Sequence, residues 1–150
     1  ICKLKDTNWK FGIKSQLKWF KDNVKKNDIH NLLYFKSKLI SYTLLRKRLY
    51  NTDHNSKKKN YLLFDTLVTE KNYRKKNFSD LIMSFNNMII MQTGFFSFLI
   101  CKNNMVNFYK KKDWVQLNKK NIKIVDHPFS TNGMLFNTNN IQKYYFFFNK

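Results

Sequence analysis

The first half of the chain shows the spacing of apolar residues that is typical of helices. From Ile13 to Val24 they recur every three or four positions with lysines between them, which predicts an amphipathic helix with a basic outer face. A longer stretch from Ile29 to Tyr50 carries leucines and isoleucines at similar spacing behind Asp28, a residue that favours helix starts. We therefore expect a second helix there, followed by a polar loop over residues 51–60.

In the second half, helical spacing gives way to alternation. The run from Tyr61 to Val68 is apolar, and its periodicity assigns no element type. Ser79 or Asp80 favours the start of a third helix that continues toward Gly94, because both residue types cap helices well. Helical spacing then recurs from about residue 99 to residue 111.

Short alternating segments dominate the last third of the sequence. Residues 114–117 and 122–125 flank the polar stretch 118–121, which predicts a β-hairpin. A turn over residues 130–133 leads to one more expected strand at 134–136.

These elements together predict an α+β fold, in which a basic helical N-terminal half precedes a small helix-helix-hairpin module. A length of 150 residues suits one compact domain, or a small domain with extensions. We expect a basic helical region over residues 1–77, the module over 78–138 and a C-terminal tail over 139–150.

The charge changes this picture, because 29 basic residues oppose 9 acidic ones and give a formal net charge of +20. Such self-repulsion destabilises a compact chain unless an anionic partner neutralises it, and either nucleic acid or an anionic membrane would do so. The sequence has no alanine, 3 glycines and 1 proline, which indicates an A+T-rich gene of the kind found in organelles. The same codon bias favours lysine, so part of the charge reflects the gene and not a partner.

Several segments of the second half resemble the RNA-binding module of small-subunit ribosomal protein four, here called the S-four module. They are residues 85–88 with 94–96 for its first helix, 106–110 for its second, 115–120 for its hairpin, and Pro128 with Gly133 for its turn. Near the start, Cys2-Lys3-Leu4 and Asn8-Trp9 are similar to the opening of mitochondrial members of that family. Asn107 and Lys119 depart from the family pattern, which has arginine and glycine there.

The resemblance implies a structural component of a mitochondrial small ribosomal subunit, located with the ribosome in the matrix. Its partners would be small-subunit ribosomal RNA, which it would help to fold during assembly, and neighbouring ribosomal proteins. Lysines would contact phosphates, and an indole would stack or pack. The residues expected to bind RNA are Lys102, Asn107, Lys110, Lys111, Lys112, Trp114, Asn118, Lys119, Lys120 and Lys123.

Nothing in the sequence has the spacing of a known catalytic or metal site. His30, His54 and His127 are scattered, and no glycine-rich nucleotide-binding fingerprint is present. Cys2 and Cys101 lie too far apart for a zinc motif. We therefore expect no enzyme activity, no cofactor, no metal and no small-molecule substrate.

A membrane protein is the alternative interpretation. Residues 81–101 contain no charged side chain and are about long enough to cross a bilayer. The chain would then be a lysine-rich subunit of an inner-membrane respiratory complex, anchored by that segment. Asn86, Asn87 and Gln92 lie toward the middle of the span, where unpaired amides are costly, and they favour the ribosomal interpretation.

Overall fold

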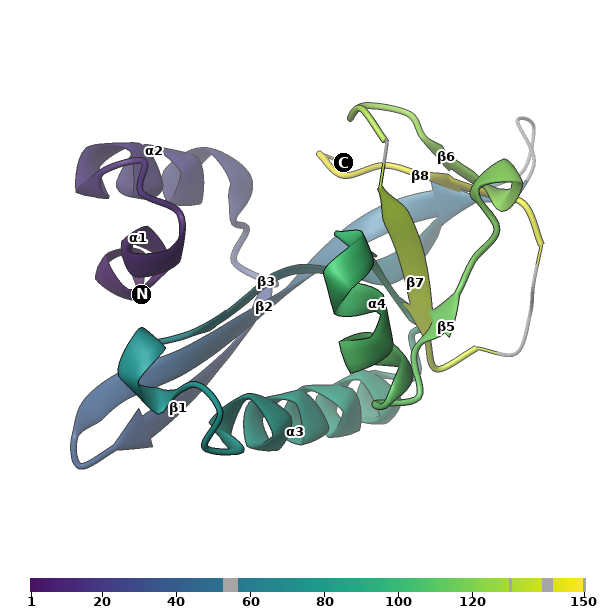
Figure 1. Cartoon of the computed structure of the whole chain (residues 1–150). Coiled ribbons are helices and arrows are strands. Elements are labelled where there is room, and N and C mark those ends of the chain that lie inside the picture. Colours follow the sequence, from purple (N-terminus) through teal and green to yellow (C-terminus); the bar gives the residue numbers. More distant parts are fainter. Residues whose placement is uncertain (53–56, 130, 139–141, 150) are drawn as a thin grey trace. The chain divides into compact units, whose positions relative to one another are not determined.

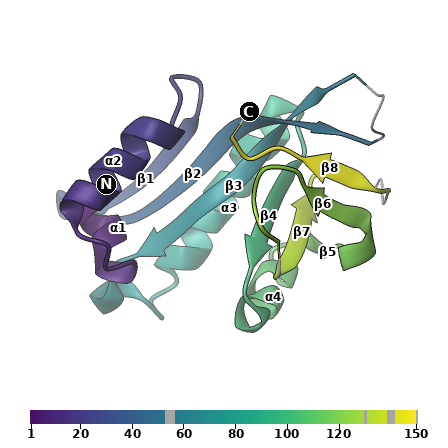
Figure 2. The same cartoon turned by 90° about the horizontal axis from the view of Figure 1, so that it is seen from above.

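The structure, a computed structural model, describes residues 1–52, 57–129, 131–138 and 142–149 (Figures 1 and 2). They form two units, each described by itself below. Unit 1 comprises Ile1–Arg46 with Asp65–Asn86, and unit 2 comprises Lys47–Phe64 with Asn87–Lys150. Outside the described residues lie parts of the predicted loop (53–56, with His54), turn (130) and tail (139–141 and 150). The predicted boundaries at residues 77 and 138 stay predictions.

Unit 1 has two short helices on one face of its strands and the start of a long helix on the other (Figure 1). Tyr42 and Leu44 pack with Leu4 and Val68, and Trp9 and Trp19 close over this apolar cluster. The elements of the unit are α1 (Cys2–Asn8), α2 (Ile13–Asn23), β1 (Ile29–Phe35), part of β2 (Lys38–Asn51), part of β3 (Lys59–Thr69), the 3-10 helix η1 (Lys71–Tyr73) and part of α3 (Phe78–Thr93).

The opposite face of the unit 1 strands is polar and buried. The amide oxygen of Asn86 on α3 accepts hydrogen bonds from Asn31 at 3.0 Å and from Thr43 at 2.9 Å. The hydroxyls of Thr69 and Ser79 lie 3.0 Å apart and tie the first turn of α3 to the end of β3. Hydrogen bonds between buried polar groups are directional, so they fix where α3 begins.

A β-hairpin replaces the helix that the sequence predicts over residues 29–50. β1 pairs with β2 in antiparallel register from Ile29↔Leu45 to Phe35↔Lys38, around a two-residue turn in which Lys36 and Ser37 are both left-handed. The prediction was wrong because most of β2 is buried on both faces. A strand of this kind shows no alternation, and its apolar residues can then mimic helical spacing.

Unit 2 is built on a mixed sheet with strand order β5-β7-β4-β3-β2-β8-β6. The pairs β3–β4 and β6–β8 are parallel, whereas β4–β7, β5–β7 and β2–β8 are antiparallel. Its core is aromatic, with Phe98 stacked on Phe146 at 3.9 Å between ring centroids. Besides the remaining parts of β2, β3 and α3, the unit contains β4 (Ser97–Cys101), α4 (Asn103–Lys110), β5 (Val115–Gln116), the 3-10 helix η2 (Lys119–Asn121), β6 (Ile122–Ile124), β7 (Asn132–Phe136) and β8 (Tyr144–Phe146).

The predicted hairpin over residues 114–125 is also wrong. Its two short strands exist, but β5 pairs with β7 and β6 with β8, and residues 118–121 lead through η2. The predicted helix over 99–111 is divided between β4 and α4. The helix over 13–24, the helix toward Gly94 and the strand at 134–136 are confirmed.

The predicted fold class is therefore wrong as a whole. The described residues form four α-helices and a mixed sheet, in place of a helical N-terminal half and a helix-helix-hairpin module. The proposed membrane anchor over 81–101 is split as well, since α3 ends at Thr93, Gly94 is left-handed and β4 begins at Ser97. In the described part of the chain, every helix is too short or too polar to span a bilayer.

Candidate functional site

The turn that joins β3 to α3, residues 70–77, has an unusual backbone. Lys75 and Asn77 both have positive φ angles, of 60° and 59°. Left-handed residues occur in the turns whose successive backbone N–H groups point toward one side and form concave sites for anions. α3 begins at Phe78 and runs for 16 residues, so its positive dipole end lies at the end of this turn.

The 70–77 turn is held to the rest of unit 1 by specific contacts. The Glu70 N–H donates to the Ile40 carbonyl at 2.8 Å, and its carboxylate pairs with Lys38 at 2.7 Å. Arg74 donates from Nε to the Thr69 carbonyl at 2.9 Å and from Nη2 to the Asn8 side chain at 3.0 Å. These contacts order the turn before any ligand binds.

The 70–77 turn also concentrates positive charge. The side chains of Lys71, Arg74, Lys75 and Lys76 are all exposed. Among the described residues, no group accepts a hydrogen bond from the backbone N–H of Lys75, Lys76 or Asn77. Free N–H donors, nearby cations and a helix N-terminus together suit a phosphate or pyrophosphate group.

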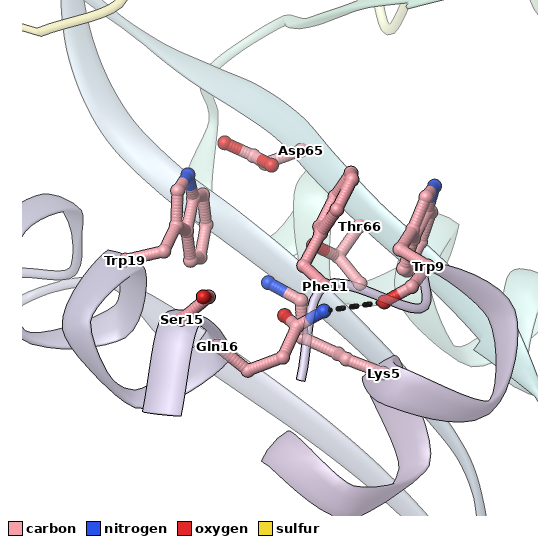
Figure 3. Close-up of a pocket in the computed structure, with 8 residues that line it drawn as sticks. All are labelled: Lys5, Trp9, Phe11, Ser15, Gln16, Trp19, Asp65 and Thr66. Carbon is pink, nitrogen blue, oxygen red and sulfur yellow. Dashed lines mark hydrogen bonds between the residues drawn. The ribbon is translucent and has the colours of Figure 1, made fainter. Parts of the chain in front are cut away.

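Unit 1 also contains a pocket of about 270 Å³ between α1, α2 and β3 (Figure 3). The connection from α1 to α2 forms its rim, and three hydrogen bonds shape that connection. Gln16 donates to the Trp9 carbonyl at 2.8 Å, the Phe11 N–H donates to the same carbonyl at 2.7 Å, and the Gly12 N–H donates to Asp6 at 2.8 Å. The pocket is lined by Lys5, Trp9, Phe11, Ser15, Gln16, Trp19, Asp65 and Thr66.

The ammonium group of Lys5 lies inside this pocket. Lys5 is only 5% exposed, and its Nζ lies 3.5 Å from the centroid of the Trp19 ring. Burial lowers the pKa of Lys5, an effect that the nearby Asp65 carboxylate opposes. Asp65 itself forms an ion pair with Arg46, whose guanidinium lies 5.7 Å from the same indole.

The residues that the sequence singled out for RNA binding lie elsewhere, in unit 2. Trp114 is 1% exposed, donates from Nε1 to the Asn87 side chain at 3.1 Å and packs on Phe64 and Phe136. An open pocket of about 700 Å³ brings together Lys110, Trp114, Asn118, Lys119 and Lys120. Outside its lining lie Lys102 at the start of α4, Asn107 on α4, Lys111 and Lys112 in the turn after α4, and Lys123 on β6.

Neither a protein-family model nor a curated protein matches the sequence, but solved structures match the fold. A Bacillus subtilis N-acetyltransferase, YlbP, in complex with coenzyme A, is 13% identical with a TM-score of 0.59, covering 90% of this chain and 88% of its own. A GNAT-family acetyltransferase from Staphylococcus aureus Mu50 is 9% identical with a TM-score of 0.58, covering 81% and 74%. A mutant of the toxin AtaT, bound to acetyl-CoA and the C-terminus of the antitoxin AtaR, is 11% identical with a TM-score of 0.56, covering 80% and 72%.

The chain has an acetyltransferase fold. This finding overturns the resemblance to ribosomal protein four and the ribosomal function and partners that it implied, and equally the respiratory-subunit alternative. The same comparison contradicts the expectation of a chain without enzyme activity, because the solved structures that share this fold include acetyltransferases. No observation tests whether the ten unit 2 residues contact RNA or whether the protein is mitochondrial, and both stay predictions.

Sequence reasoning missed the 70–77 turn because it searched for glycine. Left-handed positions in phosphate-binding turns are usually glycine, whereas here Lys75 and Asn77 occupy them. The order of elements was a signal for this site, because an apolar run at 61–68 is followed by a basic segment and then by a helix predicted to start at residue 79 or 80. Lys5 gave no signal, because its burial depends on residues of other elements, from Trp19 on α2 to Asp65 on β3.

Proposed function

We propose that this protein is an N-acetyltransferase that uses acetyl-CoA. The observation that carries the proposal is the 70–77 turn, an anion site located at the junction of a strand and the longest helix of an acetyltransferase fold. Solved structures with the same fold contain coenzyme A or acetyl-CoA. The turn offers this chain a way to hold the pyrophosphate group that both molecules carry.

The donor set of the turn fits a pyrophosphate. Backbone N–H groups of Lys75, Lys76 and Asn77 supply fixed donors, and the exposed lysines supply charge that can adjust to the ligand. The guanidinium of Arg74 is already held by Thr69 and Asn8, so it contributes a positioned charge. Fixed donors reduce the entropy lost on binding.

The reaction that follows from this proposal is acetyl transfer to an amine. The neutral amine attacks the thioester carbonyl carbon, a carbon–nitrogen bond forms and the carbon–sulfur bond breaks. The amine loses a proton and the departing thiolate gains one, giving an N-acetylated product and coenzyme A. The protein's contribution at the turn is to bind and orient the donor molecule, which converts a bimolecular encounter into a positioned one.

Calorimetric titration with acetyl-CoA tests the proposal. The double variant Lys75→Glu with Lys76→Glu places repulsive charge at the turn and should weaken binding by about tenfold or more. The matched control, Lys25→Glu with Lys26→Glu, changes the same charge at two exposed lysines of unit 1 outside the turn and should bind like the wild type.

A shortened donor sharpens the same experiment. S-acetylpantetheine has the thioester but lacks the pyrophosphate, so the wild type should bind it more weakly than acetyl-CoA. In the Lys75→Glu, Lys76→Glu variant the two molecules should bind with similar affinity. The proposed function is wrong if the wild type shows no saturable acetyl-CoA binding, or if the turn variant and the control variant lose affinity equally.

A further inference from the structure

The ammonium of Lys5 in the unit 1 pocket lacks an acceptor. It lies over the Trp19 ring, and no oxygen in the described part of the chain accepts a hydrogen bond from it. An ammonium has three donors, and burial of Lys5, which is 5% exposed as a residue, removes part of the hydration that they would have in water. In Figure 3 the side chain points into the pocket, toward the space between Trp19 and Phe11.

The charges around the pocket favour a negative ligand group. Asp65 is the carboxylate among the lining residues, and its charge is matched by Arg46 through their ion pair. The Lys5 charge is therefore left over. An anionic oxygen beside Nζ would replace lost hydration and form a charge-assisted hydrogen bond, which is stronger than a bond between neutral groups.

The remaining walls of the pocket suit an aromatic or otherwise apolar body. Trp9, Phe11 and Trp19 contribute rings from the α1–α2 connection and from α2. Phe11 is 71% exposed, so a large apolar ring at the rim is left without cover. Small-molecule pockets commonly combine such rings with a few polar groups that fix orientation.

We propose that this pocket binds the carboxylate of an aromatic amino acid through Lys5, with the aromatic ring of the ligand packed among Trp9, Phe11 and Trp19. This inference rests on the proposed function in one respect, that the amine of the bound amino acid is the acetyl acceptor. The binding preference itself requires neither acetyl-CoA nor turnover. Lys5 is then the residue that determines specificity for a carboxylate.

Three related probes separate the groups that the pocket recognises. Phenylalanine has the ring, the amine and the carboxylate, 3-phenylpropionate lacks the amine, and phenethylamine lacks the carboxylate. Calorimetric titration of the full chain should show that phenylalanine and 3-phenylpropionate bind about tenfold or more tightly than phenethylamine, because only they can accept from Lys5.

Substitutions on α1 assign the preference to one lysine. Lys5→Met keeps an unbranched side chain without charge, and it should remove the preference for the two carboxylates. Lys3→Met changes an exposed lysine of the same helix and should leave the preference intact. Circular dichroism melts of both variants establish that they are folded, and the wild-type comparison of the three probes stands without either variant.

Each outcome has a definite meaning. Equal binding of phenylalanine and phenethylamine by the wild type, binding of none of the three probes, or a carboxylate preference that persists in a folded Lys5→Met variant would overturn the inference. Acetyl-CoA binding without a carboxylate preference would overturn the inference alone. A carboxylate preference without acetyl-CoA binding would instead overturn the proposed function and leave the pocket assignment standing.

Discussion

Two lysine-lined pockets among the described residues, one in each unit, differ in how their ammonium groups are solvated. In unit 2, Lys110 and Lys120 line an open pocket of about 700 Å³ and are exposed to water. In unit 1, Lys5 lines a pocket of about 270 Å³ and is 5% exposed. A hydrated lysine gains little from a new partner, whereas a desolvated one gains much. The density of lysines in a sequence is therefore a weaker guide to a site than the burial of one.

The largest expected effect on stability is at Trp114, in the lysine-rich part of unit 2. Replacing Trp114 with alanine removes a fully buried ring and leaves the Asn87 acceptor without its donor. The free energy of unfolding should fall by about 3–5 kcal/mol. Urea unfolding followed by circular dichroism measures this, and a loss below about 1 kcal/mol would contradict the packing role. Replacing the half-buried Trp9 of the unit 1 pocket with alanine should lower the free energy of unfolding by a smaller amount.

A second effect distinguishes the buried lysine by its pH dependence. Burial lowers the pKa of Lys5 in the folded protein below its ordinary value of 10.5, so the folded state loses this proton before the unfolded chain does. The destabilisation by the ammonium is present at neutral pH and fades as the pH rises through the folded pKa toward 10.5. Wild-type stability should therefore rise relative to Lys5→Met over that range, in parallel urea titrations.

The control for this pH effect is the exposed Lys3. The matched variant Lys3→Met removes an exposed lysine from the same helix and is titrated in parallel. At neutral pH, the free energy of unfolding of Lys5→Met should exceed that of the wild type by about 1 kcal/mol. Removing the uncompensated donor stabilises the variant, and the loss of the cation–π contact offsets part of this gain. A flat difference for Lys5→Met would show that its ammonium is solvated after all.

Glycine substitutions at left-handed positions should have a smaller effect in both units. Lys75 in unit 1 and Asp113 in unit 2 have φ angles of 60° and 65°. Lys75→Gly should raise the free energy of unfolding by about 0.5–1 kcal/mol. Asp113→Gly should gain less, because aspartate tolerates this conformation better than lysine does. Thermal melts of the two variants give the order, and a larger gain at Asp113 would contradict it.

The smallest effect is expected at the exposed lysines of unit 2. Lys110→Gln combined with Lys120→Gln should change the free energy of unfolding by no more than about 0.5 kcal/mol, since hydrated surface charges contribute little. Urea unfolding at two salt concentrations checks this. A change in the free energy of unfolding as large as that of Lys5→Met would contradict the distinction between the two pockets.

Local sequence patterns predicted the helices correctly where these patterns were strong. They predicted the wrong element where burial of a strand or the conformation of a turn determined the structure. The helix over 13–24 has a clear apolar stripe, and α3 begins at Phe78, within two residues of the start predicted from Ser79 and Asp80. The hairpin of β1 and β2 was missed, because most of β2 is buried on both faces and the hairpin turn is Lys36-Ser37, without glycine. Strand pairing in unit 2 is set by residues far apart in the chain, which local spacing does not reveal.

The shortage of glycine hid the turns of the candidate site and of the fold in the same way. After α4, the Trp114 N–H donates to the Tyr109 carbonyl and the Asp113 N–H to the Lys110 carbonyl, both at 3.2 Å. This is the pattern of a helix end that normally has glycine at the left-handed position, which is here Asp113. Of the candidate site, the basic character of the 70–77 turn was visible in the sequence, but its backbone geometry was not.

The place of β8 in the strand order has a consequence for how the chain folds. Tyr144–Phe146 pairs with both β2 and β6, and Phe146 covers Phe98 in the core of unit 2. During synthesis, Phe146 is added to the chain almost a hundred residues after Tyr50, its partner on β2. The β1–β2 hairpin can form within microseconds of leaving the ribosomal exit tunnel. The sheet of unit 2 is complete only after β8 has been synthesised and has paired with β2 and β6. During that interval its aromatic strands are exposed, and chaperones that hold nascent chains would bind there first.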